Sequence, residues 1–359
     1  MYERVTVCYF SGTGNALTAG RWIAEAAAGK GIKADVVAID RFRRIEVPGH
    51  VKRRLVGFCY PTHGFGIPWY MLKFILRFPA RGRCGFFLLN TRAGSKIGRL
   101  FLPGVSGIAL LLPALVLLLK GFRLRGLFSV DLPSNWTSVH PGYNWPTVAA
   151  MFDRCRAAVG RFSARLLAGR FASRPNVLVM LPVDLLLAPI ALLYFVYGRF
   201  WLAKLFFAAK DCDGCGLCVE KCPTASIRLR GGLPFWKFSC ESCMRCLNVC
   251  PRRAIQVSHL LAVLIGFGST LLPLALLFRL IDPALPGALQ GPINFAVNWG
   301  IFMSFIFLIS GLAWWLLRTK PFNLLFTYSS LTKYWRHYLA PGLGARDFRN
   351  EELKKQKEK

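Results

Sequence analysis

Cysteine is the residue type whose spacing most clearly suggests chemistry in this chain. Twelve cysteines occur in 359 residues, and eight of them fall between residues 212 and 250. They form two copies of one pattern, CDGCGLCVEKCP at 212–223 and CESCMRCLNVCP at 240–251, each reading C-x2-C-x2-C-x3-C-P. The chain opens on MYERVTVCYF, without a secretory leader pattern. In such a chain we expect clustered cysteines to bind metal and not to form disulfides.

The spacing of these cysteines suits iron–sulfur cubanes. Three closely spaced cysteines can bind three irons of one cubane, while the fourth, followed by proline, turns toward a second cubane. Thiolate sulfur is the soft ligand that such cores need. The first cluster would use Cys212, Cys215, Cys218 and Cys250, and the second would use Cys240, Cys243, Cys246 and Cys222. A zinc ribbon is the alternative, although one zinc ion needs only four ligands and no repeated four-cysteine unit.

Residues 210–257 resemble a bacterial-type ferredoxin domain with two 4Fe–4S clusters, and the motif matches at all eight ligand positions. The segments ASIRL after Pro223 and AIQV after Pro251 fit the two short strands of that fold. The resemblance implies a small α+β domain in which each cluster carries one electron.

A second candidate site lies in YFSGTGNALTAG, residues 9–20, directly after a strand-like run. A dinucleotide-binding fingerprint would require a third glycine where Leu17 stands, which disfavours that reading. Hydroxyl, amide and flexible backbone groups instead form a loop that could close on a phosphate at a helix N-terminus. These groups belong to Ser11, Gly12, Thr13, Gly14 and Asn15.

This loop resembles the FMN-phosphate loop of flavodoxins, S/T-x-T-G-x-T, with Ala16 in place of the final threonine. Residues 1–150 alternate strand-like and helix-like segments, which favours a parallel sheet with helices on both faces. The resemblance implies an α/β flavodoxin-like doubly wound parallel sheet with FMN as its cofactor. It also implies that the loops after the third and fourth strands hold the flavin ring, through Thr62, His63, Gly64, Thr91 and Gly94.

The order of the two regions resembles the fused flavodoxin–ferredoxin electron-transfer family. Long apolar runs depart from its soluble members: 54% of the residues are hydrophobic, and the net charge is +30. Lysine and arginine flank the apolar runs and do not form one block, which favours an anionic membrane surface over nucleic acid. We therefore expect a membrane-attached member that has membrane lipid, and no nucleic acid, as a partner.

The apolar runs suggest how the chain meets a membrane. Within residues 258–317, the runs 258–278 and 293–317 are each long enough to span, so we expect a C-terminal transmembrane helical hairpin, with a buried soluble hairpin as the alternative. Basic flanks place the ferredoxin domain and the basic tail, residues 318–359, on the cytoplasmic side of the inner (cytoplasmic) membrane. Residues 151–209 are expected to form a helix and an apolar interfacial or re-entrant linker, since one crossing there would separate the two redox domains.

Residues 100–120 fall between two strands of the same sheet, so they cannot cross the bilayer once. We expect an apolar helix there that packs on the sheet and is either membrane-facing or fully buried.

These features predict a membrane-anchored electron-transfer protein. It would pass electrons between FMN and two 4Fe–4S clusters, to or from a redox partner protein or a lipophilic acceptor at the membrane. The alternative is a flavin and iron–sulfur reductase acting directly on a lipophilic substrate such as a quinone or an isoprenoid, and a redox sensor is a third class. Only 17 acidic residues occur, and no constellation suggests hydrolysis, so no catalytic residue is assigned.

Overall fold

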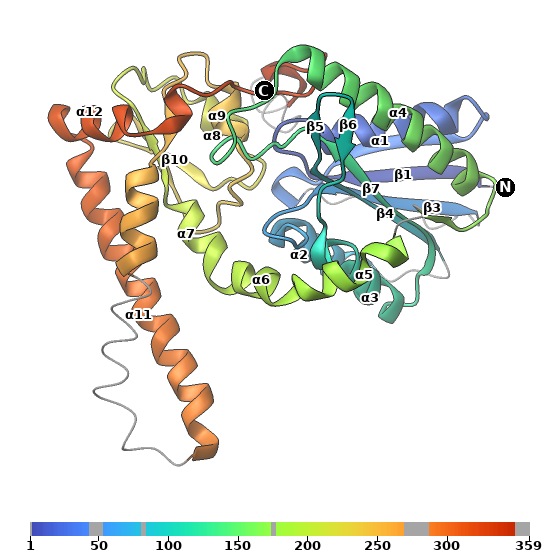
Figure 1. The fold of residues 1–359 in the computed structure, drawn as a ribbon, viewed down its shortest axis with the longest axis horizontal. Coiled ribbons are helices and arrows are strands. Elements are labelled where there is room, and N and C mark those ends of the chain that lie inside the picture. Colours follow the sequence, from blue (N-terminus) through green and yellow to red (C-terminus); the bar gives the residue numbers. More distant parts are fainter. Residues whose placement is uncertain (1, 43–52, 80–83, 174–176, 269–286, 349–359) are drawn as a thin grey trace, which may run out of the picture.

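The computed structural model describes residues 2–42, 53–79, 84–173, 177–268 and 287–348. A sheet domain occupies the N-terminal part of the chain, and a smaller domain contains the cysteine motifs (Figure 1). Bent helical segments connect the two domains on one side, and one long helix, α11 (Gly287–Leu316), extends away from both.

The sheet domain is built on six parallel strands in the order β2-β1-β3-β4-β7-β8. The strands are β1 (Arg4–Tyr9), β2 (Lys33–Ala38), β3 (Arg54–Pro61), β4 (Gly85–Ala93), β7 (Arg123–Leu132) and the short β8 (Ala172–Ser173). Leaving β8 aside, this is the 2-1-3-4-5 order of flavodoxin-like doubly wound sheets. The prediction of a parallel flavodoxin-like sheet is confirmed.

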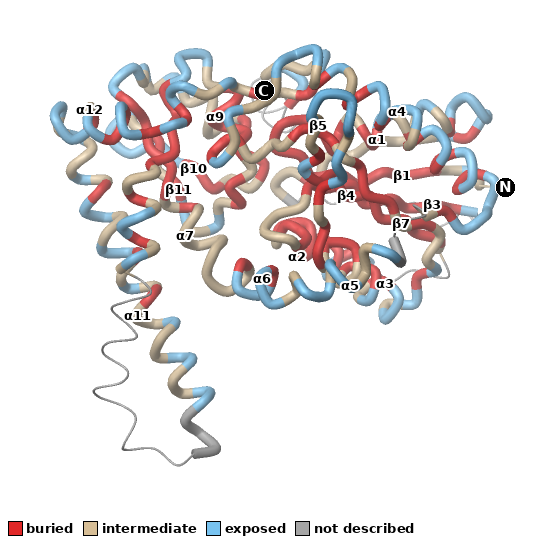
Figure 2. The backbone as a smooth tube through the Cα atoms, viewed as in Figure 1, coloured by how far each residue is buried: buried red, intermediate tan, exposed pale blue. Residues whose placement is uncertain are grey.

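Helices cover both faces of this sheet. They are α1 (Asn15–Ala28) and α4 (Trp145–Leu167) on one face, and α2 (Trp69–Arg77) and α3 (Leu111–Leu119) on the other. Successive β1 residues alternate between the two cores: Val7 packs with the first pair of helices and Cys8 with the second. Figure 2 shows the central strands β1, β3 and β4 buried along most of their length, as expected of a sheet covered on both sides.

The region expected as one helix over residues 100–120 is divided in the structure. It contains the second strand of an antiparallel hairpin, β5 (Ser95–Ile97) and β6 (Leu100–Leu102), then a 3-10 turn (Gly107–Ala109) and α3. Pro103 follows the hairpin directly, and proline cannot donate the hydrogen bond that a continuous helix needs there. Helix α3 buries Leu117 against the sheet but leaves Leu119 80% exposed. The helix is therefore shorter than expected, and it has both a packed and an exposed apolar side.

The smaller domain consists of two short antiparallel pairs and two helical turns. They are β9 (Phe206–Ala208) with β12 (Ile255–Val257), β10 (Ile227–Arg230) with β11 (Leu233–Trp236), α8 (Leu217–Glu220) and α9 (Arg245–Val249). The two strands expected after the cysteine motifs are present as β10 and β12. Each pairs with a neighbouring segment and not with the other.

The connection between the domains is a bent helical segment of α5 (Val177–Leu186), α6 (Ala188–Leu193), a π-helical turn (Tyr194–Gly198) and α7 (Arg199–Ala203). The axis changes direction by 46° at Leu187, where Pro182 and Pro189 lie nearby. The Asp184 carboxylate accepts a hydrogen bond from the Gly107 N–H at 2.8 Å, which holds α5 against the sheet domain. By length and composition the segment could be a broken span or a re-entrant loop, so the predicted linker stays a prediction.

Within the described residues, one continuous helix is long and apolar enough to cross a membrane. It runs from Gly291 to Leu316, with a mean hydropathy of 1.9 and only 11% of its apolar window buried. A helix at His259–Gly268 packs beside it, with Ile265 and Ile306 in one core. Residues 269–278 of the first predicted span lie outside the described residues, so the predicted hairpin is not shown.

Part of the expected basic tail is folded. Helix α12 (Lys320–Tyr328) and two 3-10 turns (Leu331–Lys333 and Ala345–Asp347) follow α11, and the chain then returns to the sheet domain.

Gly57 on β3 offers a test of the sheet packing. A Cβ atom there would lie 2.0 Å from the buried Phe87 ring on β4, so Gly57→Ala overpacks the core at a cost of about 1–3 kcal/mol. The expected result is a fall of several degrees in the midpoint of thermal unfolding, partly reversed by Phe87→Leu. Gly160→Ala on α4 is the control, because no described atom outside its own stretch of helix lies within 4 Å of its added Cβ. An unchanged midpoint in Gly57→Ala would contradict this packing.

Candidate functional site

The first predicted set of cysteines surrounds one cavity, lined by Cys212, Cys215, Cys218 and Cys250. Gly214 and Gly216 both adopt positive φ in this loop, and a Cβ on Gly214 would lie 2.8 Å from the Gly232 carbonyl oxygen. The Asp213 carboxylate accepts a hydrogen bond from the Cys215 N–H at 3.1 Å. The two glycines and the Asp213 hydrogen bond therefore shape a loop whose cysteines line one cavity.

The second predicted set is more deeply enclosed. Burial raises the pKa of the Cys246 thiol well above its usual range, and the nearby thiols of Cys240, Cys243 and Cys222 raise it further. The backbone N–H of Ser226 donates to Cys222 Sγ at 3.3 Å, and that of Ser242 donates to Cys240 Sγ at 3.4 Å. Hydrogen bonds to sulfur are one means by which proteins adjust the potential of an iron–sulfur cluster.

Each set thus combines three cysteines of one motif with the fourth of the other, which is the crossed arrangement that the spacing predicts. Within the described ranges, no three His, Cys, Asp or Glu side chains converge as ligands of a single metal ion. The assignment of the eight cysteines as cluster ligands stays a prediction, now with a geometry that suits it.

The second set lies directly against the glycine loop of the sheet domain. A Cβ on Gly12 would lie 1.7 Å from the Cys243 carbonyl oxygen, so only glycine allows this approach. The neighbouring Arg245 is 2% exposed and donates hydrogen bonds to the Ser11 carbonyl and the Asp40 carboxylate. Burial opposes the charge of Arg245, but Asp40 and Cys243 outweigh this effect, so its pKa lies above the ordinary value.

The C-terminal segment closes the other side of the glycine loop. The Ala340 N–H donates to the Thr13 carbonyl at 2.8 Å, and the Tyr338 hydroxyl donates to the Asn15 side-chain oxygen at 2.6 Å. A Cβ on Gly14 would lie 2.4 Å from the side chain of Leu343. The loop is therefore enclosed between the cysteine domain and residues 338–343.

This enclosure decides whether the loop fits an FMN phosphate. The Ser11 hydroxyl accepts the Gly14 N–H at 3.0 Å, and the Asn15 amide donates to the Pro133 carbonyl at 2.9 Å. Thr13 is 0% exposed, and its hydroxyl has no hydrogen-bond partner among the described residues. The Cys243 carbonyl lies against Gly12 and the Leu343 side chain against Gly14, and Ala16 supplies no hydroxyl. The residues present do not fit FMN in this arrangement, which differs from the expectation that the resemblance gave.

The first predicted ring loop is covered by the bent connection. A Cβ on Gly64 would lie 2.2 Å from the Tyr194 ring, and burial lowers the pKa of His63 to about 4. The Thr62 hydroxyl accepts a hydrogen bond from the Asn90 amide at 2.7 Å. A small cavity remains between the domains, lined by Thr62, His63, Gly64, Asn135, Trp136, Tyr194, Ser242 and Met244.

The second predicted ring loop, which follows β4, contacts the neighbouring strand ends of the sheet. The Thr91 carbonyl accepts the Thr62 N–H at 2.8 Å, so the two loops are hydrogen-bonded to each other. A Cβ on Gly94 would lie 2.8 Å from Asp131, whose carboxylate pairs with Arg92 at 2.6 Å. Thr91 and Gly94 thus lie at the strand end, as predicted. Their surroundings are the loop after β3 and the end of β7.

A family model described as a 4Fe–4S dicluster domain matches residues 211–255. The match contains both cysteine motifs and supports at least one 4Fe–4S cluster, and with it an electron-transfer role. No curated protein matches the chain.

Two solved structures are similar to the chain over less than half of its length. One is a flavodoxin from the domain Archaea, at 13% identity and a TM-score of 0.29, covering 46% of this chain and 99% of that one. The other is the Trp repressor binding protein from Bacillus subtilis, at 14% identity and a TM-score of 0.30, covering 45% and 96%. The strand order, and not these weak similarities, assigns the fold of the sheet domain.

Sequence reasoning missed the residues that join the domains. Arg245 is a charge inside a cysteine motif, and a buried charge requires an acidic partner, but the sequence does not show that this partner is Asp40. Tyr338 and Ala340 lie in a segment whose composition gave no sign that it returns to the glycine loop.

Cys222→Ser tests the crossed ligation. It should remove the cluster that Cys240, Cys243 and Cys246 would hold and leave the other, so iron falls from about eight to about four per chain. Iron and sulfide analysis with EPR of the reduced protein measures this. Cys84→Ser, which lies outside both sets, should leave both signals unchanged. Loss of only the signal from the Cys212 set would refute the crossing.

Arg245→Met tests the contact between the domains. The substitution leaves Asp40 without its partner, and breaking a buried pair costs about 3–5 kcal/mol. We expect a lower unfolding midpoint and faster iron release to a chelator, with partial recovery in the Arg245→Met/Asp40→Asn double variant. Arg156→Met is the control, since Arg156 pairs with Glu25 at an exposed position of the sheet domain. Equal effects of both single variants would show that the buried contact has no special role.

Proposed function

We propose that this chain is a membrane-anchored electron-transfer protein that uses two 4Fe–4S clusters to exchange electrons with a membrane-associated partner. The observation that carries the proposal is the presence of two separate four-cysteine sets in one small domain, whose core continues into the projecting helix through residues such as Leu261 and Ile306. Each cluster, when bound, supplies a one-electron carrier.

The two sets differ in exposure, which suggests different roles. Cys215 of the first set is exposed, so this end of the domain can approach the partner. Cys222 and Cys246 of the second set are buried in the core of the cysteine domain, where the surrounding residues exclude water. In this proposal electrons enter or leave at the Cys215 side, and the second set relays them inside the protein.

FMN has no part in this proposal. Loop 11–15 and Arg245 instead hold the cysteine domain in position, so the glycine loop has a structural role. FMN binding would require the 243–245 segment or residues 338–343 to move away from the loop.

Membrane attachment rests on α11 and the bent connection, which among the described residues are long and apolar enough to enter a bilayer. The charge of +30 suits an anionic cytoplasmic leaflet. We therefore place the protein at the inner (cytoplasmic) membrane, with both domains on the cytoplasmic side.

Cofactor analysis of the full chain, purified without oxygen in detergent, tests the proposal. We expect about eight irons per chain, from two four-iron clusters, and no stoichiometric flavin. Stoichiometric FMN that dissociates on acid treatment would overturn the structural role of the loop. Zinc in place of iron would overturn the electron-transfer role itself.

A further inference from the structure

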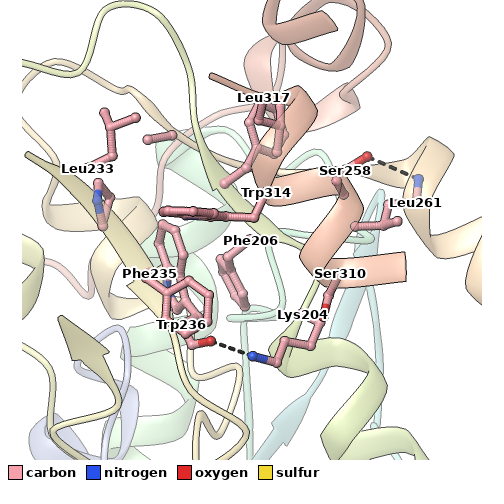
Figure 3. A pocket seen from close by; sticks show the side chains of 14 residues that line it. Lys204, Phe206, Leu233, Phe235, Trp236, Ser258, Leu261, Ser310, Trp314 and Leu317 are labelled. Atoms are coloured by element: carbon pink, nitrogen blue, oxygen red, sulfur yellow. Dashed lines mark hydrogen bonds between the residues drawn. The ribbon is translucent and has the colours of Figure 1, made fainter. Parts of the chain in front are cut away.

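A groove lies where the cysteine domain meets the end of α11 (Figure 3). Its walls come from β9, the β10–β11 hairpin and α11, and most of its lining is aromatic or aliphatic. The lining residues that matter here are Phe206, Phe235, Trp236, Leu261, Trp314 and Leu317. Trp236 stacks on Phe206, with ring centroids 5.7 Å apart.

Four cations gather around two rings of this groove. Lys204 and Arg230 lie 4.7 and 4.1 Å from the Phe235 ring centroid, and Arg318 lies 3.9 Å from that of Trp314. Arg228 also faces Phe235, at 5.3 Å. No acidic residue lines the groove, and none of the four cations forms an ion pair within the described part of the chain.

The groove lies at the level expected for a membrane surface. The candidate span ends at Leu316, Trp314 lies in its last turn, and Arg318 follows it. Tryptophan and basic residues are enriched at this level of membrane helices. With α11 in a bilayer, this apolar groove and the cations around it would therefore lie in the interfacial region.

We propose that this groove binds one anionic phospholipid, with its phosphate among Lys204, Arg228, Arg230 and Arg318 and an acyl chain along the apolar lining. The charges are complementary, because four unpaired cations repel one another and a phosphate offers several acceptor oxygens. The apolar lining suits an acyl chain. The Lys204 ammonium donates one hydrogen bond to the Trp236 carbonyl at 2.7 Å, which leaves two N–H donors for the phosphate. This inference rests on the membrane attachment proposed above.

Such a lipid would lie beside the second cysteine set. Trp236 is 4% exposed, lines the groove and belongs to the same buried core as Cys246. An acyl chain in the groove would keep water away from this side of the set. Solvent access is one of the factors that adjust the potential of an iron–sulfur cluster.

Lipid binding to the full-length protein tests the inference. Detergent-solubilised, delipidated protein is titrated with phosphatidylglycerol or phosphatidylcholine, and bound lipid is measured by native mass spectrometry. We expect one tightly bound phosphatidylglycerol and weaker phosphatidylcholine binding. Arg230→Gln/Arg318→Gln removes two charges and should weaken phosphatidylglycerol binding about thirtyfold. Arg230→Lys/Arg318→Lys should retain most of the affinity.

The matched control is Arg161→Gln/Arg165→Gln, two exposed positions on α4 of the sheet domain with the same change in net charge. Equal loss in the control, equal binding of phosphatidylcholine, or equal competition by soluble glycerol phosphate would overturn the lipid site. A quinone retained in the groove in place of phospholipid would also overturn it. Iron content and flotation with neutral vesicles are measured in parallel. Failure of flotation would contradict membrane attachment, whereas normal flotation without phosphatidylglycerol selectivity would contradict this site alone.

Discussion

The buried guanidinium of Arg245 makes the contact on which the arrangement of the two domains depends. It joins the Ser11 carbonyl, the Asp40 carboxylate and the Lys221 carbonyl, which come from both sides of the domain boundary. A buried charge is tolerated when it is paired with an opposite charge and hydrogen-bonded. These partners therefore restrict the second cysteine set to one position, against Gly12.

Because the second cysteine set lies against Gly12, the carboxyl-terminal edge of the sheet contacts protein segments where a ligand would otherwise bind. Open α/β sheets bind ligands at the carboxyl ends of their strands, and the loop after β1 has the glycines and the helix N-terminus that a phosphate would need. Here the same edge contacts the Cys243 carbonyl on one side and residues 338–343 on the other. The edge binds other parts of the chain, and the electron-transfer role falls to the cysteine domain.

The cysteine domain is also joined to the apolar helix α11. Leu261, Ile265 and Ile306 belong to one core with Trp236 and Leu247, so domain and helix share buried contacts. A shared core prevents the domain from turning freely relative to the helix. If the helix lies in a bilayer, the distance between the second set and the membrane surface is then determined by packing, and the cationic groove lies at that junction.

The sequence by itself determined the local features of this protein. Repeated cysteine spacing identified the iron–sulfur motifs, because ligand geometry restricts positions close together in the chain. Alternating apolar runs identified the parallel sheet, because burial on both faces follows the strand pattern. The tertiary structure alone decided that Arg245 meets Asp40, that Tyr338 covers Asn15, and that the phosphate-type loop is filled. The first two of these contacts join residues 205 and 323 positions apart. Local spacing carries no information about which distant surfaces will pack together and exclude water.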